Sequence, residues 1–185
     1  TPSMLIAQLR PQLTETNLAS GFMVPRGSSM RSQLGKGDLT ACDFRTAQDV
    51  TLWPIELTSA QYFSFAPDLP LSALPVAKKI KGGVRLRFKA TAGLTFNQLN
   101  LDRLQLYFAG SDEVAYKLYE LCFGASLGML VAPATRPWPW HEFLGPRNIK
   151  NVGYVDEQAL LPTTLRTFQG YRLLEEYFSS AMHRR

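Results

Sequence analysis

Cysteine, histidine and long apolar runs are scarce in this chain. Two cysteines and two histidines occur among 185 residues, all far apart, so neither a disulfide framework nor a closed zinc site is predicted. Cys42 and Cys122 are instead expected to be small buried hydrophobes. No apolar run approaches the roughly 18 residues that span a bilayer, and no Asn-x-Ser/Thr acceptor occurs. These absences predict no metal and no direct membrane insertion, and they fit a reducing, cytosolic setting.

Glycine-rich phosphate-binding motifs are missing as well. Gly35-Lys36 has Met30 at the position where a P-loop has its first glycine. Residues 21–27 do not follow the dinucleotide-binding pattern either. The sequence therefore predicts no cofactor.

The charges of the chain are spread along it rather than concentrated. Twenty Lys and Arg against fifteen Asp and Glu give a net charge of +5. The densest cluster, Lys78, Lys79 and Lys81, is typical of a solvated loop because two glycines follow it. With Arg85 and Arg87 it leaves nucleic-acid binding as an alternative function. No nucleic-acid partner is expected, since such a patch needs more charge on one face.

Alternating apolar and polar residues predict several strands. Residues 84–90 show the clearest pattern, with valine, leucine, phenylalanine and alanine facing inward and Arg85, Arg87 and Lys89 facing outward. Residues 104–108 repeat it, and residues 4–10 and 127–131 are also predicted strands. Residues 41–58 are expected to form one strand whose inward face changes at Pro54. One wet face on each strand favours antiparallel pairing.

Two helices are predicted in the second half of the chain. One follows the N-cap residue Ser111 over residues 112–123, and the other covers residues 170–179. Hydrophobic residues make up 45% of the chain, enough to bury a core. We expect an α+β fold that is mainly antiparallel β-sheet and sandwich-like, with two or more packed helices. Residues 1–185 are interpreted as one globular fragment of a longer protein, with a sub-boundary around the proline-rich residues 66–83.

Residues 124–128 match the G-x-S-x-G pattern of α/β-hydrolases. Ser126 would be the nucleophile, with Asp156 and His183 following in the chain order of that family. A nucleophile elbow needs a strand, a tight turn and then a helix, whereas the predicted order here is helix, turn and strand. A glycine that ends a helix explains the pattern more simply. A hydrolase using Ser126 therefore remains only an alternative, and no catalytic residue is assigned.

Residues 137–143 hold two tryptophans between prolines. Trp138 and Trp140, with Phe143 beyond them, provide large and stiff apolar area, and such residues are enriched at binding hot spots. The structural interpretation, in which they close one end of the core, is the alternative. Both interpretations remain open at this point.

Three segments carry a resemblance to a known family. Residues 42–57 read CDFRTAQDVTLWPIEL and closely resemble the C-x-F-R-T-A-x-x-V-T-L-W-P segment of the TssF (VasA/ImpG) family. Residues 159–162 (ALLP) and 168–178 (FQGYRLLEEYF) are similar to a later block of that family. The opening Pro2-Ser3-Met4 also resembles a family motif. The order and the separation of the segments agree, so the resemblance covers nearly the whole chain.

The resemblance implies a scaffold role in the type VI secretion baseplate and no enzymatic activity. The expected partners are TssG, TssK and TssE, with a second TssF copy as a further candidate, in wedges at the base of a contractile sheath. The expected location is the cytoplasm, in a baseplate docked at the inner-membrane complex. The resemblance implies an internal fragment of a longer subunit.

The motif residues are divided into two groups by their chemistry. Arg45 and Arg172 could each bind a carboxylate with two hydrogen bonds, within the fold or across a subunit contact, so both join Trp138, Trp140 and Phe143 as candidate partner-binding residues. Asp43, Asp49, Glu175 and Glu176 remain open as their acidic partners. The apolar motif residues are expected to hold a sheet and a helix together: Phe44, Leu52, Trp53, Pro54, Leu173 and Tyr177.

Overall fold

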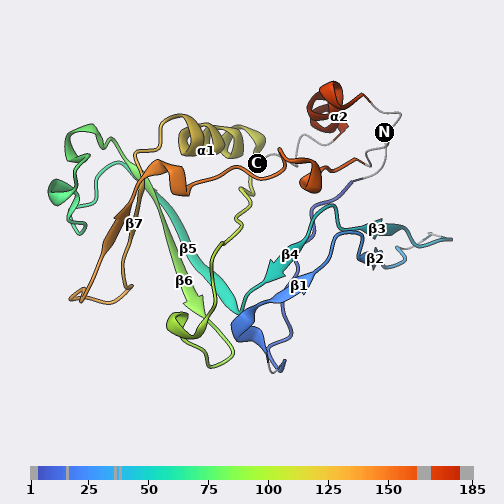
Figure 1. Ribbon diagram of the computed structural model, residues 1–185, viewed down its shortest axis with the longest axis horizontal. Helices are drawn as coiled ribbons and strands as arrows, with labels where there is room; N and C mark the ends of the chain where they lie inside the picture. The colour runs from blue at the N-terminus through green and yellow to red at the C-terminus, as the bar shows by residue number, and fades with distance from the viewer. Residues whose placement is uncertain (1–3, 16, 36, 38, 162–167, 180–185) are drawn as a thin grey trace. The chain divides into compact units, whose positions relative to one another are not determined.

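The chain divides into two units, each assembled from segments that are separate in the sequence. A computed structural model describes residues 4–15, 17–35, 37, 39–161 and 168–179 (Figure 1). The first unit comprises Thr1–Pro54, Leu94–Gln105 and Asn151–Arg185, and the second comprises Ile55–Gly93 and Leu106–Lys150. Residues 66–83 lie inside the second unit. The sub-boundary expected there stays a prediction.

The N-terminal part of the first unit contains two nested antiparallel pairs. β1 (Phe22–Val24) pairs with β4 (Val50–Leu52), and β2 (Ser29–Arg31) pairs with β3 (Asp43–Arg45). Between the two pairs, the Gly27 N–H donates to the Thr46 carbonyl at 2.8 Å. The first family-like segment, residues 42–57, therefore runs antiparallel to the strands that precede it. The turn between β3 and β4 lies beside the turn between β1 and β2.

A short helix and a glycine lead into these pairs. The 3₁₀ helix η1 (Leu18–Ser20) buries Leu18 and ends at Gly21, whose φ is +76°. A Cβ at Gly21 would lie 2.5 Å from Thr51 Cγ2, so the close approach to β4 requires glycine. The Asn100 N–H donates to the Ala19 carbonyl at 3.0 Å and attaches residues 94–105 to this region.

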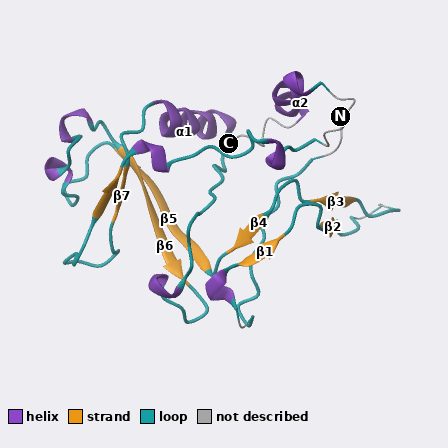
Figure 2. Ribbon diagram, in the orientation of Figure 1, coloured by secondary structure: helices purple, strands orange, loops and turns teal. Residues whose placement is uncertain are grey.

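The remaining elements of the first unit are helical (Figure 2). They are η4 (Phe96–Gln98), η6 (Asp156–Gln158), η7 (Gln169–Tyr171) and the α-helix α2 (Arg172–Ser179). Few apolar residues are buried in the described part of this unit: Leu18, Pro54, Leu99 and Ala159.

The second unit is built on one long antiparallel pair. β5 (Ile55–Phe63) pairs with β6 (Gly83–Ala90), with a bulge between Leu57 and Ser59. At the bulge, Thr58 Oγ1 donates to the Arg87 carbonyl at 3.1 Å. The alternation predicted for β6 is confirmed over residues 86–90, because Leu86 and Phe88 are half-buried whereas Arg87 and Lys89 are exposed. It is wrong at the start of the strand, where Val84 is exposed and Arg85 is half-buried against Asp68 and the Phe63 ring.

The helix α1 (Asp112–Gly124) lies beside this pair, in the place that the sequence predicts. Its first turn carries acidic side chains, which the helix dipole favours, and Ala115 is fully buried. A groove of about 360 Å³ is lined by Tyr62 and Val84 from the sheet and by Val114 from the helix. The other elements of this unit are η2 (Leu71–Ala73), η3 (Ala77–Lys79), β7 (Met129–Val131), β8 (Glu142–Leu144) and η5 (Pro146–Asn148).

The α+β class with antiparallel pairing and two helices is confirmed, and each sheet in the described part of the chain has two strands. Three strand predictions are wrong. Residues 4–10 and 104–108 form no strand, because alternation alone does not supply a partner strand, and no strand of the described residues pairs with either segment. Residues 41–58 form three strands rather than one, since a turn at residues 46–49 separates β3 from β4 and Pro54 separates β4 from β5.

Candidate interaction surfaces

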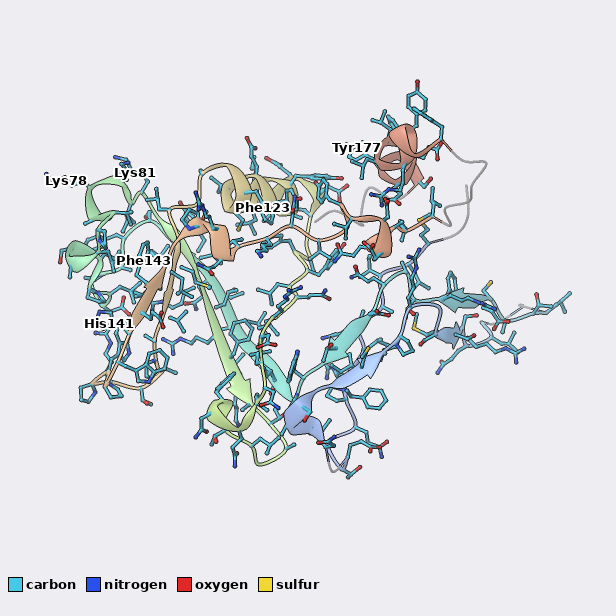
Figure 3. The ribbon with its side chains drawn as sticks, viewed as in Figure 1. Lys78, Lys81, Phe123, His141, Phe143 and Tyr177 are labelled. Atoms are coloured by element: carbon cyan, nitrogen blue, oxygen red, sulfur yellow. The ribbon has the colours of Figure 1, made fainter. Side chains whose placement is uncertain are left out.

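A hairpin in the second unit carries the two tryptophans. β7 pairs with β8 in the register Met129↔Leu144, and the loop between them, residues 132–141, is named the aromatic arm. Gly128 precedes β7 with a φ of +147°, and a Cβ there would lie 2.4 Å from the Leu144 carbonyl oxygen. Glycine therefore allows the tight start of the hairpin. Figure 3 shows Phe143 on the strand and His141 on the arm.

The aromatic arm is attached to the rest of its unit by one carboxylate between two arginines. Asp68 Oδ1 accepts a hydrogen bond from Arg85 Nη2 at 2.8 Å, and Asp68 Oδ2 lies 3.7 Å from Arg136 Nη2. The Arg136 guanidinium in turn lies 4.6 Å from the centre of the Trp138 ring, within cation–π distance. This arrangement, the Asp68 bridge, fixes one end of the arm.

The charges of the Asp68 bridge are at the surface. The hydrogen bond from Arg85 and the nearby arginine charges lower the pKa of Asp68 below its ordinary value. Solvent screens such exposed pairs strongly, so they contribute little to stability. The Asp68 bridge therefore contributes little to the stability of the unit, and its Arg136 lies against the Trp138 ring.

The structure places the two tryptophans differently. Trp140 is 53% exposed, whereas Trp138 is half-buried and its Nε1 is a buried donor with no acceptor among the described residues. Phe143 is half-buried at the root of the hairpin. Trp140 thus has free apolar area, and Trp138 has an unused donor beside it.

Arg172 is a buried charge inside the first unit. It is 7% exposed and donates from Nη2 to the Tyr154 carbonyl at 2.7 Å. Its Nη1 lies 3.5 Å from Glu176 Oε1, and its Nη2 lies 3.6 Å from Asp156 Oδ1. Glu176, one of the acidic partners that the sequence leaves open, is therefore a true partner, and Asp156 is an additional one that sequence reasoning missed.

Glu176 contacts both Arg172 and the backbone of residues 160–161. It has no exposed surface, and its Oε1 accepts hydrogen bonds from the N–H groups of Leu160 at 2.9 Å and Leu161 at 3.5 Å. The Arg172–Glu176 pair lies one helical turn apart on α2 and so binds α2 to residues 154–161. The two halves of the second family-like block are held together by these buried polar contacts.

Arg26 is a second internal contact that sequence reasoning missed. Its guanidinium donates to the carbonyls of Glu157 at 3.0 Å and Ala159 at 2.9 Å. Its own backbone N–H donates to Asp49 Oδ1 at 2.7 Å. Arg26 therefore connects the first family-like segment to the second. Its acceptors are backbone carbonyls, which every residue carries, so the sequence does not show where Arg26 binds. The turn Pro25-Arg26-Gly27 is the only sequence feature here that draws attention to Arg26.

The other motif residues are placed as follows. Arg45 is exposed, and in the described part of the chain its guanidinium makes no hydrogen bond or ion pair. Asp43 instead lies 3.9 Å from Arg31, on the paired strand. Phe44, Leu52 and Trp53 are half-buried and Pro54 is fully buried, whereas Leu173 and Tyr177 on α2 are exposed, like Tyr171, Leu174 and Phe178 (Figure 3 labels Tyr177).

The expectation that both thiols are buried is wrong for Cys42. Cys42 is exposed because it lies just before β3, on a strand pair with no layer above it among the described residues. Cys122 is half-buried on α1, where burial raises the pKa of its thiol. Within the described residues, no three histidine, cysteine or acidic side chains lie close enough together to hold a metal ion.

The hydrolase pattern is a helix end in the structure. α1 ends at Gly124, and β7 begins at Met129 after a short turn that contains Ser126, in the order that the sequence predicts. Asp156 belongs to the other unit, and His183 lies outside the described residues. Lys78, Lys79 and Lys81 are exposed around η3, as expected for a solvated loop (Figure 3).

No helix in the part of the chain that the structure describes is both long and apolar enough to cross a bilayer.

Comparison with known proteins identifies relatives across the chain. A family model described as "Type VI secretion system, TssF" matches residues 1–183. The "Type VI secretion system component TssF1" of Pseudomonas aeruginosa is 46% identical over 180 residues, which is 97% of this chain and 29% of the relative. The chain thus spans less than a third of the length of that relative. No solved structure matches the chain.

Proposed function

Because the chain belongs to the TssF family of the type VI secretion system, we propose that it is a structural part of the baseplate wedge. In this proposal it assembles with TssG, TssK and TssE, and with a second TssF copy, at the base of a contractile sheath. The baseplate lies in the cytoplasm and docks at the inner-membrane complex. The family match over residues 1–183 carries the proposal.

The exposed apolar side chains support an assembly role. Trp140 and Phe178 are exposed by 53% and 79% of their surfaces. Folded proteins rarely leave large apolar patches uncovered unless another polypeptide covers them. Buried apolar residues are few among the described residues: Leu18, Pro54, Ala66, Leu74, Leu99, Ala115 and Ala159.

The aromatic arm is the contact that we propose for a neighbouring subunit. Trp140 supplies exposed apolar area, Trp138 is half-buried in the same loop with its Nε1 enclosed, and the Asp68 bridge orients the loop before binding. A contact that is already ordered loses less entropy on binding. Arg45 is the second candidate, because its guanidinium is exposed and lacks a partner in the described residues. Arg172 is withdrawn, since its charge is used inside the fold.

The test is co-expression of the full-length protein that contains this chain with its cognate TssG, TssK and TssE. We expect a complex of defined mass by affinity purification and light scattering. Replacing both tryptophans, Trp138→Ala and Trp140→Ala, removes the proposed hot spot and should weaken the complex about thirtyfold or more.

The matched control is Phe65→Ala, which removes an exposed aromatic ring of the same unit outside the aromatic arm. It should leave the complex intact. Failure of the full-length protein to co-purify with any of the three subunits would contradict the proposed function. An intact complex with the double tryptophan variant would remove the aromatic arm from it.

A further inference from the structure

β6 has a strand on one side only. β5 pairs with it at eight positions, from Ile55↔Ala90 to Phe63↔Gly83, and no third strand joins this sheet among the described residues (Figure 1). A two-stranded pair is marginal by itself in water. An edge of this length is a template for a further strand, because its outward N–H and C=O groups are unpaired.

A hydrogen bond at the bulge shows which backbone groups of β6 face β5 and which face the free edge. Thr58 Oγ1 donates to the Arg87 carbonyl, so the backbone groups of Arg87 face β5. In an antiparallel strand the N–H and C=O of one residue share a side, and the next residue uses the opposite side. Leu86 and Phe88 therefore direct their N–H and C=O groups to the free edge. Neither makes a backbone hydrogen bond to a turn or loop in the described part of the chain.

The side chains of β6 define the strand that this edge accepts. Arg87 and Lys89 are exposed on one face, and no carboxylate lies within ion-pair distance of either among the described residues. The opposite face carries Leu86 and Phe88. An added strand therefore needs acidic residues on one face and apolar residues on the other, because opposite charges stabilise cross-strand pairs.

A second copy of this chain does not fit. Two antiparallel β6 strands would place arginine and lysine opposite one another, and like charges in that position are destabilising. A shift of one residue would turn the basic side chains to the apolar face. Asp68 is not the missing acidic partner of this edge either, because its carboxylate contacts the side chain of Arg85 rather than Arg87 or Lys89.

We infer that the free edge of β6 is a strand-addition site for a segment of another polypeptide that alternates acidic and apolar residues. The backbone groups of Leu86 and Phe88 supply the hydrogen bonds, and Arg87 and Lys89 select the acidic face. This surface is separate from the aromatic arm. It can be tested without the other baseplate subunits, so its failure and that of the baseplate proposal are distinguishable.

The probe is a ten-residue peptide that alternates glutamate and valine, titrated against the full-length protein that contains this chain by fluorescence anisotropy. We expect it to bind about tenfold more tightly than a lysine–valine peptide of equal length. The amides of Leu86 and Phe88 should gain protection from hydrogen exchange on binding. Methylating alternate backbone nitrogens of the glutamate–valine peptide should abolish binding, and this control leaves the protein unchanged.

Reversing the charges of Arg87 and Lys89 tests whether these two side chains select the acidic peptide. The double variant Arg87→Glu/Lys89→Glu should reverse the preference toward the lysine–valine peptide. The matched control Lys78→Glu/Lys79→Glu makes the same charge change on η3 and should keep the preference for the acidic peptide.

Three outcomes would overturn the inference. The first is equal affinity for the acidic and basic peptides. The second is loss of the preference in the control pair, which would show general attraction to a basic protein. The third is self-association of the free chain that protects Leu86 and Phe88, because the edge would then belong to a second copy.

Discussion

Arginine serves opposite purposes in the two units. In the first unit, Arg172 is buried with Glu176, and Arg26 donates to backbone carbonyls, so both fix loops to neighbouring elements. In the second unit, Arg85 and Arg136 meet Asp68 at the surface and orient the aromatic arm. A buried pair is costly to break, whereas an exposed pair contributes little. The arginines of the first unit therefore differ from Arg85 and Arg136 in their acceptors: Arg172 meets a buried carboxylate and the exposed Arg26 meets backbone carbonyls, whereas Arg85 and Arg136 meet an exposed carboxylate.

The largest effect is expected from breaking the buried pair. Glu176→Leu leaves the Arg172 charge and the Leu160 N–H without their acceptor, and it should cost about 3–5 kcal/mol of unfolding free energy. Urea unfolding of the chain, followed by circular dichroism, measures this loss.

Two further variants show whether the loss comes from breaking the Arg172–Glu176 pair or from placing a leucine on α2. Glu175→Leu changes an exposed neighbour on α2 and should have little effect. Arg172→Met with Glu176→Leu removes both charges and should recover most of the loss. Equal losses for Glu175→Leu and Glu176→Leu would show that burial of the pair is not what matters.

An intermediate effect is expected at Arg26. Arg26→Met removes hydrogen bonds from a charged donor to three carbonyls, one of them in a partly buried contact, and should cost about 1–2 kcal/mol. The control is Arg31→Met, whose 3.9 Å ion pair with Asp43 is exposed. Its unfolding free energy should be almost unchanged, and a loss as large as that of Arg26→Met would contradict the assignment.

The smallest effect on stability is expected at Asp68. The lowered pKa means that any stabilising contribution of the carboxylate is present above its unfolded pKa and is lost as the pH falls through the lowered folded value. Asp68→Asn should therefore unfold like the wild type between pH 5 and pH 8, apart from a small shift. Its tryptophan fluorescence should change, because Arg136 loses the group that holds it at Trp138. A strongly destabilised variant would show that the Asp68 bridge does stabilise the unit.

Local patterns were sufficient to predict some elements. β6 and α1 follow from strict alternation and from an N-cap with an acidic first turn. Residues 104–108 carry the same alternation without forming a strand, because pairing depends on a neighbour that periodicity does not specify.

The contacts of the charged motif residues could be predicted only in part. Glu176 was one of four acidic residues left open as partners, and its position four residues after Arg172 on the same helix is the signal that could have singled it out. Asp156 and the carbonyl acceptors of Arg26 are distant in sequence, and a carbonyl exists at every residue. The family resemblance gave the function class, but it did not show which arginine is internal.

Hydrogen exchange of the full-length protein, free and in complex with TssG, TssK and TssE, tests the central claim most directly. The claim is that the buried charges of the first unit hold the fold while the second unit meets its partners. We predict that the Leu160 and Leu161 amides are protected equally in both states, and that Leu86, Phe88 and the aromatic arm gain protection in the complex. Protection gained at Leu160 and Leu161, with none in the second unit, would contradict the account.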